Sequence, residues 1–261
     1  AFQFLRSDDP RTKRDGENYI PTDQLYVLSP DGQQIMLKKA RRFTRSEMMV
    51  MEMLSTNEWK RPMYFATTVG SDYHLGLDPY LELTGMAYRI TPTRSADGRP
   101  RVNTEVMYDN MMNKFRYGNV NKPGIYLDEN TLRMCRTHRM MFSELAEALY
   151  EEGKHDKAIE VLDYAEEMLP GYNVSYDYTS ASMAALYYTL GEMEKGNAIM
   201  DQVATNAVEY MEWGTTLEPA SRKAAQSTLG HYSAVLGFVL NNLQRFEQKE
   251  LFNKYFELYS Q

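Results

Sequence analysis

The sequence predicts an α+β fold that is mainly α, with a small mixed α/β portion (residues 1–127) followed by an array of helical hairpins (residues 128–261). Three observations predict it. Short β-prone segments separated by turn signals occupy the first portion. From Asp128 onward the apolar residues instead recur with helical spacing. Within that second portion a pattern of small and large residues repeats, which is typical of stacked hairpins.

The composition is that of an ordinary globular protein, since 43% of the 261 residues are hydrophobic and 25% are charged. A formal charge of −7 argues against nucleic acid as a partner, because phosphate binding needs a dominant basic surface. One cysteine, Cys135, excludes an internal disulfide framework. No apolar run is long enough to span a bilayer. Because the sequence starts at Ala1 without a methionine, we expect a mature product or an excised piece.

The first elements are a pair of short strands and a helix. Residues 25–28 and 34–37 are β-prone and flank the turn-forming Pro30-Asp31-Gly32. Thr44 and Glu47 have the spacing of a capping box, in which each side chain accepts a backbone N–H of the first helical turn. The apolar run 48–54 continues that helix.

The rest of the first portion alternates between strands and loops. Residues 63–69 have the aromatic and β-branched content of a buried strand, and residues 86–91 can pair with it. Between them, residues 70–84 predict a loop with a short helical turn, and residues 94–101 predict a surface loop. A helix is expected over residues 105–115, ended by the glycine-rich segment that follows.

The segment from Arg139 to Pro170 predicts one tetratricopeptide-like unit of two antiparallel helices. Small alanines let the helices approach closely, Gly153 makes the turn, and Pro170 ends the unit. The packing positions are Phe142, Leu145, Ala146 and Leu149 in the first helix and Ala158, Leu162 and Ala165 in the second. One unit cannot bury its apolar face alone, so neighbouring units must stack on it.

A second unit follows at a register of 38 residues, after a connecting loop over residues 171–176. Its matching positions are Met183, Ala184, Tyr187, Gly191, Gly196, Met200 and Val203. Residues 220–242 and 245–259 form a last helical pair with little of the pattern, as expected of a terminal repeat whose outer face is wet.

The first helices of such a stack line a concave groove, which is the leading binding-site candidate. By register, its residues are Met140, Ser143, Glu147 and Tyr150, then Tyr178, Ala181, Ala185 and Tyr188. Tyrosines offer rigid contact area with a polar tip, which suits a peptide or a sugar. The alternative is that another part of the chain fills the groove. The lysines and asparagine that clamp a carboxylate in some peptide-binding repeats are missing.

Other polar clusters are weaker candidates. The basic run Lys38-Lys39-Ala40-Arg41-Arg42 with Arg45 could face anionic lipid, although such runs are more often solvated. Asp72, His74 and Asp78 could form part of a metal site, but no second ligand cluster accompanies them. Cys135 and His138 share a helix face and are more often buried fillers.

Motifs for known chemistry are lacking. The sequence has no glycine-rich phosphate loop, no nucleophile elbow and no zinc-protease motif. We therefore expect no catalytic residue, no metal and no cofactor in this chain. The oligomeric state stays open.

Three blocks resemble a specific family: NEWKRPMYFATTV (57–69), MYDNMMNKFRYGN (107–119) and YLDENTLRMCR (126–136). Together with the repeat, they resemble the C-terminal soluble region of large multi-pass membrane proteins of Bacteroidota. That family is the protein O-mannosyltransferase-like glycosyltransferase family 117, formerly a domain of unknown function. The resemblance implies a transmembrane catalytic part, absent here, that transfers sugar from a polyprenyl-phosphate donor. It also implies that this region lies on the exported, periplasmic face, tethered to the inner membrane.

No catalytic residue carries over from the family, because the resemblance implies that the acidic catalytic residues lie in loops outside this sequence. The residues that occupy the shared blocks are Trp59, Arg61, Pro62, Tyr64, Asp109, Asn110, Asn113, Arg116, Asp128, Glu129 and Asn130. They could form a site, or a fixed internal hydrogen-bond network, which we favour because satisfied buried polar groups rigidify a fold.

These observations favour a non-catalytic accessory domain that docks an acceptor protein, a glycan or a partner subunit. A different class of function is a glycan-acting enzyme that uses Asp109, Asp128 and Glu129 as acid and base, which would need paired carboxylates in an open cleft. A third is a purely structural spacer that orients the membrane part of the same polypeptide.

Overall fold

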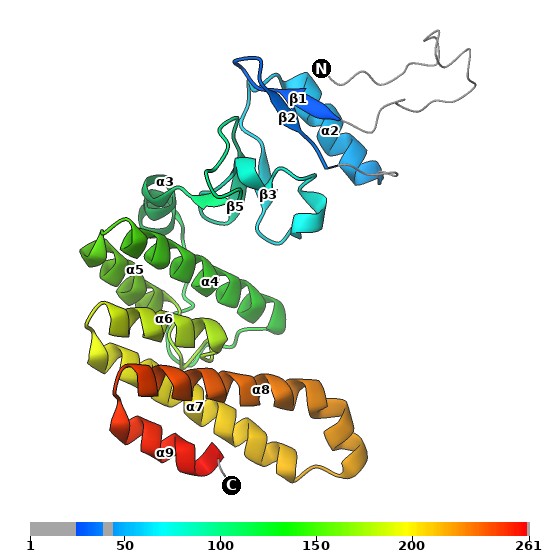
Figure 1. Ribbon diagram of the computed structural model, residues 1–261. Coiled ribbons are helices and arrows are strands. Elements are labelled where there is room, and N and C mark those ends of the chain that lie inside the picture. The colour runs from blue at the N-terminus through cyan, green and yellow to red at the C-terminus, as the bar shows by residue number, and fades with distance from the viewer. Residues whose placement is uncertain (1–24, 39–43, 260–261) are drawn as a thin grey trace. The chain divides into compact units, whose positions relative to one another are not determined.

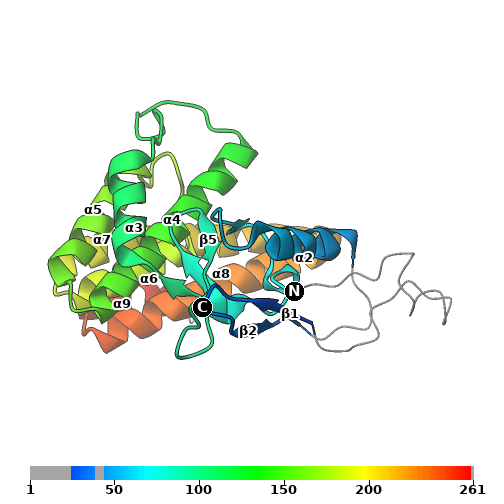
Figure 2. The same cartoon turned by 90° about the horizontal axis from the view of Figure 1, so that it is seen from above.

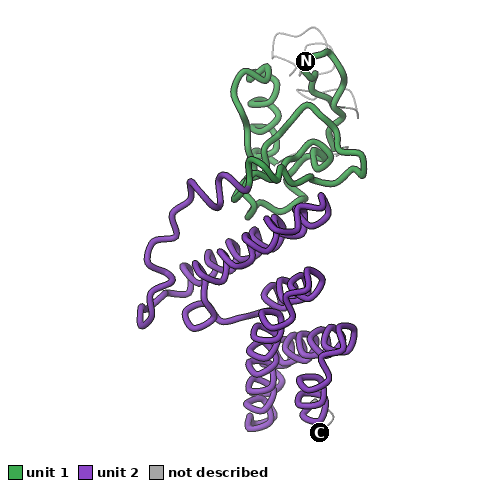
Figure 3. Tube along the Cα trace, turned by 90° about the vertical axis from the view of Figure 1, so that its left-hand side faces the viewer, with its two compact units in different colours: residues 1–107 green, residues 108–261 purple. Residues whose placement is uncertain are grey.

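The computed structural model describes residues 25–38 and 44–259. The chain divides into two compact units, residues 1–107 and 108–261 (Figure 3). The division falls before the 127/128 boundary expected from the sequence, so the segment with the second family block belongs to the helical unit. The fold is α+β and mainly α, as predicted.

The first unit begins with a small hairpin covered by a helix. Strands β1 (Tyr26–Leu28) and β2 (Gln34–Met36) pair antiparallel with Val27 opposite Ile35. Helix α2 (Arg45–Asn57) lies along this hairpin (Figures 1 and 2). Its Met51 and Leu54 are buried in the same core as Val27 and Ile35. The alternation along both strands turns one face toward α2, so the predicted strands and helix are confirmed.

The capping box at the start of α2 is also confirmed. The Glu47 amide donates to Thr44 Oγ1 at 3.3 Å, and the Thr44 amide donates to Glu47 Oε2 at 2.6 Å. These hydrogen bonds satisfy backbone donors that have no partner within the helix. They also lower the pKa of the Glu47 carboxyl, with the bond from the Thr44 amide as the largest cause.

A four-stranded sheet follows, in the order β3-β5-β4-β6. Its strands are β3 (Tyr64–Ala66), β4 (Leu81–Leu83), β5 (Ala87–Ile90) and β6 (Arg101–Val102). The pairs β3–β5 and β4–β5 are antiparallel, and β4–β6 is parallel. Two 3₁₀ turns, η1 (Ser71–Tyr73) and η2 (Asp78–Tyr80), connect β3 to β4.

The structure corrects three expectations here. Strand β4 lies in a segment predicted as a loop, and β6 begins at the last residue of another such segment. Both strands are very short and are defined by their pairing, β4 with β5 and β6, and β6 with β4. The strand predicted over residues 63–69 is confirmed only for Tyr64–Ala66. It is not buried throughout: Phe65 points into the core, whereas Tyr64 is 51% exposed.

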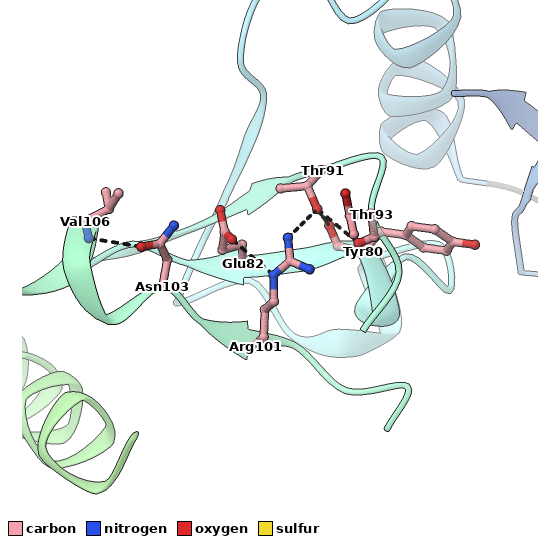
Figure 4. A network of polar contacts seen from close by, with 7 residues as sticks. All are labelled: Tyr80, Glu82, Thr91, Thr93, Arg101, Asn103 and Val106. Atoms are coloured by element: carbon pink, nitrogen blue, oxygen red, sulfur yellow. Dashed lines mark hydrogen bonds and ion pairs between the residues drawn. The ribbon is translucent and has the colours of Figure 1, made fainter. Parts of the chain in front are cut away.

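A polar network fixes the parallel edge of this sheet (Figure 4). Arg101 Nε donates to Glu82 Oε1 at 3.0 Å, and Arg101 Nη2 donates to Thr91 Oγ1 at 3.4 Å. Thr91 Oγ1 in turn lies 3.2 Å from the Tyr80 carbonyl oxygen, to which it donates. Glu82 is buried, so its charge needs this partner. The network therefore explains why a carboxylate is tolerated in the middle of β4.

The chain enters the second unit through a helix that changes its winding. Helix α3 (Thr104–Tyr108) passes directly into a π-helical segment, η3 (Asp109–Lys114). A helix was predicted over these residues, but the wider winding was not. Tyr117 follows it, and its hydroxyl donates to the Met111 carbonyl at 2.9 Å. Its ring packs 5.7 Å from that of Phe142, which ties the segment to the hairpins.

Three helical hairpins follow over the described residues 129–259 of the second unit (Figure 1). They are α4 (Glu129–Glu151) with α5 (His155–Met168), α6 (Tyr178–Thr189) with α7 (Met193–Thr215), and α8 (Pro219–Arg245) with α9 (Lys249–Tyr259). Consecutive helices pack on each other, and α6 also packs on α4. The number and order of hairpins agree with the sequence prediction.

The buried faces of the hairpins agree with the predicted register. The predicted packing positions that are buried are Phe142, Leu145, Ala146, Leu149, Ala158, Leu162, Ala165, Met183, Ala184, Tyr187, Gly196, Met200 and Val203. At Gly196, α6 and α7 approach closely: a Cβ there would lie 2.5 Å from the Tyr188 ring and 3.1 Å from the Ala184 carbonyl oxygen. A larger side chain would separate the helices.

Candidate binding cleft of the helical unit

A cleft of about 630 Å³ opens among the helices of the second unit. Its walls come from α4, the loop before α6, α6 itself, α7 and α8. The lining residues are Arg136, Ser175, Tyr176, Asp177, Tyr178, Val203, Asn206, Glu209, Tyr210, Trp213, His231, Tyr232 and Val235. Its volume lies within the range of about 300–1,000 Å³ that is typical of clefts for small ligands.

Aromatic rings dominate this cleft and support one another. The Tyr210 and Tyr232 rings stack at 4.2 Å with an interplanar angle of 21°. Trp213 meets Tyr210 edge to face at 5.1 Å, and Tyr178 packs on Phe238 at 4.8 Å. Trp213 and Tyr178 nevertheless remain 46% and 47% exposed. Each therefore offers an open ring surface that is held in place from behind.

The spacing of residues in α7 and α8 produces this arrangement. Tyr210 and Trp213 are three positions apart, so they share one face of α7. Gly214 lets α8 come close, because a Cβ there would lie 2.4 Å from the Leu229 side chain. Arg222 then donates to the carbonyl oxygens of Gly214 and Thr215, which closes the C-terminal end of α7.

Neutral polar side chains and charged side chains of both signs complete the lining. Asp177 is the N-cap of α6, where it accepts the Ser180 amide at 3.2 Å. Asn206 donates to the Tyr176 carbonyl oxygen at 3.3 Å. Arg136, Glu209 and His231 are exposed at the cleft. The cleft can thus donate and accept hydrogen bonds without a dominant charge.

A buried polar cluster holds the loop that forms one wall. The fully buried guanidinium of Arg139 donates to the carbonyl oxygens of Leu169, Val174 and Ser175 at 2.7, 2.7 and 3.0 Å. It also lies 5.2 Å from the centre of the Tyr176 ring. Because this one side chain binds three carbonyls of the loop, it fixes the segment that leads into Tyr176 and Asp177.

Glu166 belongs to the same cluster and carries an unusual pKa. The Tyr176 hydroxyl donates to Glu166 Oε2, whereas Glu166 Oε1 is buried without a hydrogen-bond partner among the described residues. Burial raises the pKa of the Glu166 carboxyl above its usual value of 4.5, despite the opposing effects of Tyr176 and Arg139. Burial likewise raises the pKa of Tyr176.

This shift predicts a pH dependence of stability. The folded protein keeps the Glu166 proton to a higher pH than the unfolded chain does. The contribution of Glu166 is therefore present in full below pH 4.5 and is lost as the pH rises through the folded-state pKa, by about 1.4 kcal/mol per pKa unit. Glu166→Gln should remove this component from urea unfolding measured from pH 4 to 8. Glu167→Gln, at an exposed neighbour, should not; equal pH profiles for Glu166→Gln and the unsubstituted protein would contradict the shift.

Of the residues predicted to line the groove, only some line the cleft that the structure shows. Tyr178 lines the cleft, whereas Met140, Ser143, Glu147 and Tyr150 do not. Tyr150 instead stacks on His155 at 5.1 Å. Tyr188 was predicted at the groove, and this prediction is wrong: it is 2% exposed, its hydroxyl donates to Asn197, and its ring packs on Phe246 at 5.1 Å. Ala181 is also buried, and Ala185 does not line the cleft.

The sequence reasoning missed most of the actual cleft. Tyr210, Trp213, His231 and Tyr232 lie in the part of the chain where the repeat pattern fades. The spacing of Tyr210 and Trp213 was an available signal. Their pairing with α8 was not, because Tyr232 comes from a different helix.

The family-block residues of the first unit act locally. Trp59 Nε1 donates to the Leu28 carbonyl oxygen at 2.7 Å, and Asn57 exchanges hydrogen bonds with the Arg61 backbone. Glu58 and Trp59 both adopt positive φ, at 48° and 60°. This backbone conformation is unfavourable for residues other than glycine, so the hydrogen bonds of Asn57 and Trp59 must stabilise it. Trp59, Arg61 and Pro62 also line a smaller cleft of about 260 Å³, whereas Tyr64 lies exposed on β3.

The block residues of the second unit stabilise helix ends. Asp109 pairs with Lys114 at 2.5 Å and accepts from Asn113, and Arg116 donates to carbonyls at the end of η3. Asp128 caps α4 by accepting the Thr131 amide at 2.7 Å. Asn110 accepts from Lys114, Asn130 accepts from Arg133, and Glu129 lies exposed in the first turn of α4. These hydrogen bonds are exposed and local to the helix ends, whereas the network favoured from the sequence was an internal one.

The carboxylates considered for an enzyme have ordinary helix-end roles. The Lys114 hydrogen bond lowers the pKa of Asp109, and the Thr131 amide lowers that of Asp128. Both groups are thus charged at neutral pH, which suits a cap or an ion pair and not a proton donor.

The remaining candidates also have structural surroundings. His74 is buried, contacts Asp78 through Nδ1 at 2.9 Å and packs on Phe65 at 4.9 Å. Among the described residues no group of three potential metal ligands comes together, so Asp72, His74 and Asp78 do not form one. Cys135 is buried, and burial raises its thiol pKa. His138 Nδ1 donates to the Met134 carbonyl. In the basic run, Lys39, Ala40, Arg41 and Arg42 lie outside the described residues.

Helices long and apolar enough to cross a membrane do not occur in the part of the chain that the structure describes. Residues 23–109 match a family described as TMEM260-associated domain 2. The match covers about a third of the chain and ends close to the end of the first unit. It associates that unit with a family of membrane-protein-associated domains, whereas the hairpins and their aromatic cleft lie outside it. Comparison with curated proteins and with solved structures gives no match.

Proposed function

We propose that the chain is a non-catalytic accessory domain of a membrane-bound glycosyltransferase-like protein. The match of residues 23–109 to a membrane-protein-associated domain supports the membrane context. The resemblance of the three sequence blocks supports the glycosyltransferase context. In this proposal the domain lies on the exported, periplasmic face, and the membrane part of the same polypeptide carries the catalysis.

The helical unit would be the docking element, as a short tetratricopeptide-like array. The observation that carries this role is the aromatic cleft, with two half-exposed rings, Trp213 and Tyr178, held by packing from behind. Rigid, partly exposed aromatic rings in a cleft are the usual anchors of binding sites, because they bury much area at a small cost in conformational entropy. The occupant would be part of an acceptor protein, a glycan or a partner subunit.

A binding role also agrees with the state of the carboxylates. Asp109 is paired with Lys114 and Asp128 caps a helix, so neither is available as a general acid. The cleft itself carries Asp177 and Glu209, of which Asp177 is also a helix cap. We therefore assign recognition, and not bond cleavage, to this chain.

The double substitution Tyr178→Ala and Trp213→Ala tests this proposal. It should weaken binding of acceptor polypeptides or oligosaccharides at least tenfold by isothermal titration calorimetry, because it removes both open rings. The fold should persist, since both side chains are half exposed; circular dichroism checks this. Tyr126→Ala, at a 90% exposed tyrosine outside the cleft, is the matched control. Equal affinities for the double variant and the control would contradict the proposal that the cleft is the docking site.

A further inference from the structure

The lining of the cleft is unusual in its balance of side chains. Tyrosine and tryptophan contribute five rings, Tyr176, Tyr178, Tyr210, Trp213 and Tyr232, whereas Val203 and Val235 are the aliphatic residues of the lining. Grooves that take apolar peptide anchors or amphipathic helices present broad aliphatic or methionine surface. This cleft instead presents flat rings bordered by planar polar groups.

Its charges exclude a strong preference for an ionic ligand. The positive charge of Arg136 opposes the negative charges of Asp177 and Glu209. The cleft therefore has no electrostatic field of one sign that would attract a polyanion or a polycation. The available polar groups include a donor, two acceptors, and His231 and tyrosine hydroxyls that can do either. A ligand with many hydroxyl groups matches this set, because each hydroxyl both donates and accepts.

The size of the cleft favours a small ligand over a folded protein partner. A specific protein–protein interface buries about 800 Å² on each side and is commonly flat. A cavity of about 630 Å³ instead suits a compact ligand of a few rings. The open faces of Trp213 and Tyr178 are the surfaces on which such rings would stack.

We propose that this cleft binds a neutral glycan, with the C–H face of a pyranose ring on Trp213 or Tyr178 and its hydroxyls on Arg136, Glu209 and His231. The inference rests on the proposed docking function and narrows its ligand class. The polarised C–H groups of a sugar face meet the negative face of the aromatic quadrupole. The bound sugar is a ligand and undergoes no reaction here.

Tryptophan fluorescence gives a direct test, because the chain has two tryptophans. Trp213 lies in the cleft, whereas the Trp59 indole donates a hydrogen bond to the Leu28 carbonyl oxygen in the first unit. Titration of the whole chain with mannotriose, cellotriose or chitotriose should give a saturable change with at least one of them. The change should vanish in Trp213→Phe. Calorimetry should still detect binding by that variant and at least tenfold weaker binding by Tyr178→Ala, with Tyr126→Ala unchanged.

The possible outcomes test the glycan assignment and the docking function separately. If polypeptides bind in a way that depends on Tyr178 and Trp213 while no trisaccharide binds at millimolar concentration, the glycan assignment is overturned and docking survives. If neither polypeptide nor trisaccharide binds, both are overturned. Trisaccharide binding that Tyr178→Ala and Trp213→Ala leave unchanged would overturn the location of the site.

Discussion

Replacing Arg139 by methionine should lower the free energy of unfolding by about 3–5 kcal/mol, the range found when one partner of a buried charged interaction is removed. The methionine keeps much of the side-chain volume but none of the donors. The carbonyls of Leu169 and Val174 would lose their bonds from Arg139, and Glu166 would lose a nearby positive charge. Since leaving a buried polar group unsatisfied costs about 1–3 kcal/mol, a large total is expected.

Urea unfolding followed by circular dichroism measures this effect, and Arg133→Met is the control because Arg133 is exposed on the same helix. A loss below about 1 kcal/mol would show that water replaces Arg139 at the loop. The substitution should also weaken ligand binding, because Arg139 positions the loop that carries Tyr176 and Asp177.

Phe142→Ala should cost about 3–5 kcal/mol, as is typical for a buried phenylalanine. The Phe142 ring is fully buried and contacts both Tyr117 and Tyr164, at 5.7 and 6.0 Å between ring centres. Removing it leaves a cavity between the first hairpin and the segment after η3. That segment should then become accessible to proteases.

Thermal and urea unfolding, with limited proteolysis around Tyr117, test this second prediction. Tyr126→Ala is the control, because its exposed ring should change stability by less than about 0.5 kcal/mol. A Phe142→Ala protein with unchanged stability and the same proteolytic pattern would mean that Tyr117 does not anchor the segment.

The local signals in this sequence predicted most of the helical unit. The inward residues of both repeats, such as Leu145 and Met183, recur with helical spacing, and that spacing begins at Asp128, next to the first residue of α4. These features depend on residues a few positions apart. A single sequence therefore contains them in full.

Features that depend on distant contacts were not predictable. Strand β6 exists because Arg101 and Val102 pair with β4, about twenty residues away in the sequence. Tyr188 was assigned to the groove by register, but Gly196 on the next helix leaves room for its ring in the core. The aromatic cleft combines α7 and α8, and no local pattern marks Tyr210 and Tyr232 as neighbours. In each case tertiary packing, and not local propensity, decides the result.

Hydrogen exchange of the whole chain, measured by mass spectrometry with and without saturating trisaccharide, tests most directly whether ligands dock in the helical unit. We predict added protection in the loop before α6, in α7 near Tyr210 and Trp213, and in α8 near His231 and Tyr232, with little change in residues 25–38 and 44–107. Protection confined to that first unit, with the aromatic cleft unchanged, would contradict the assignment of docking to the cleft.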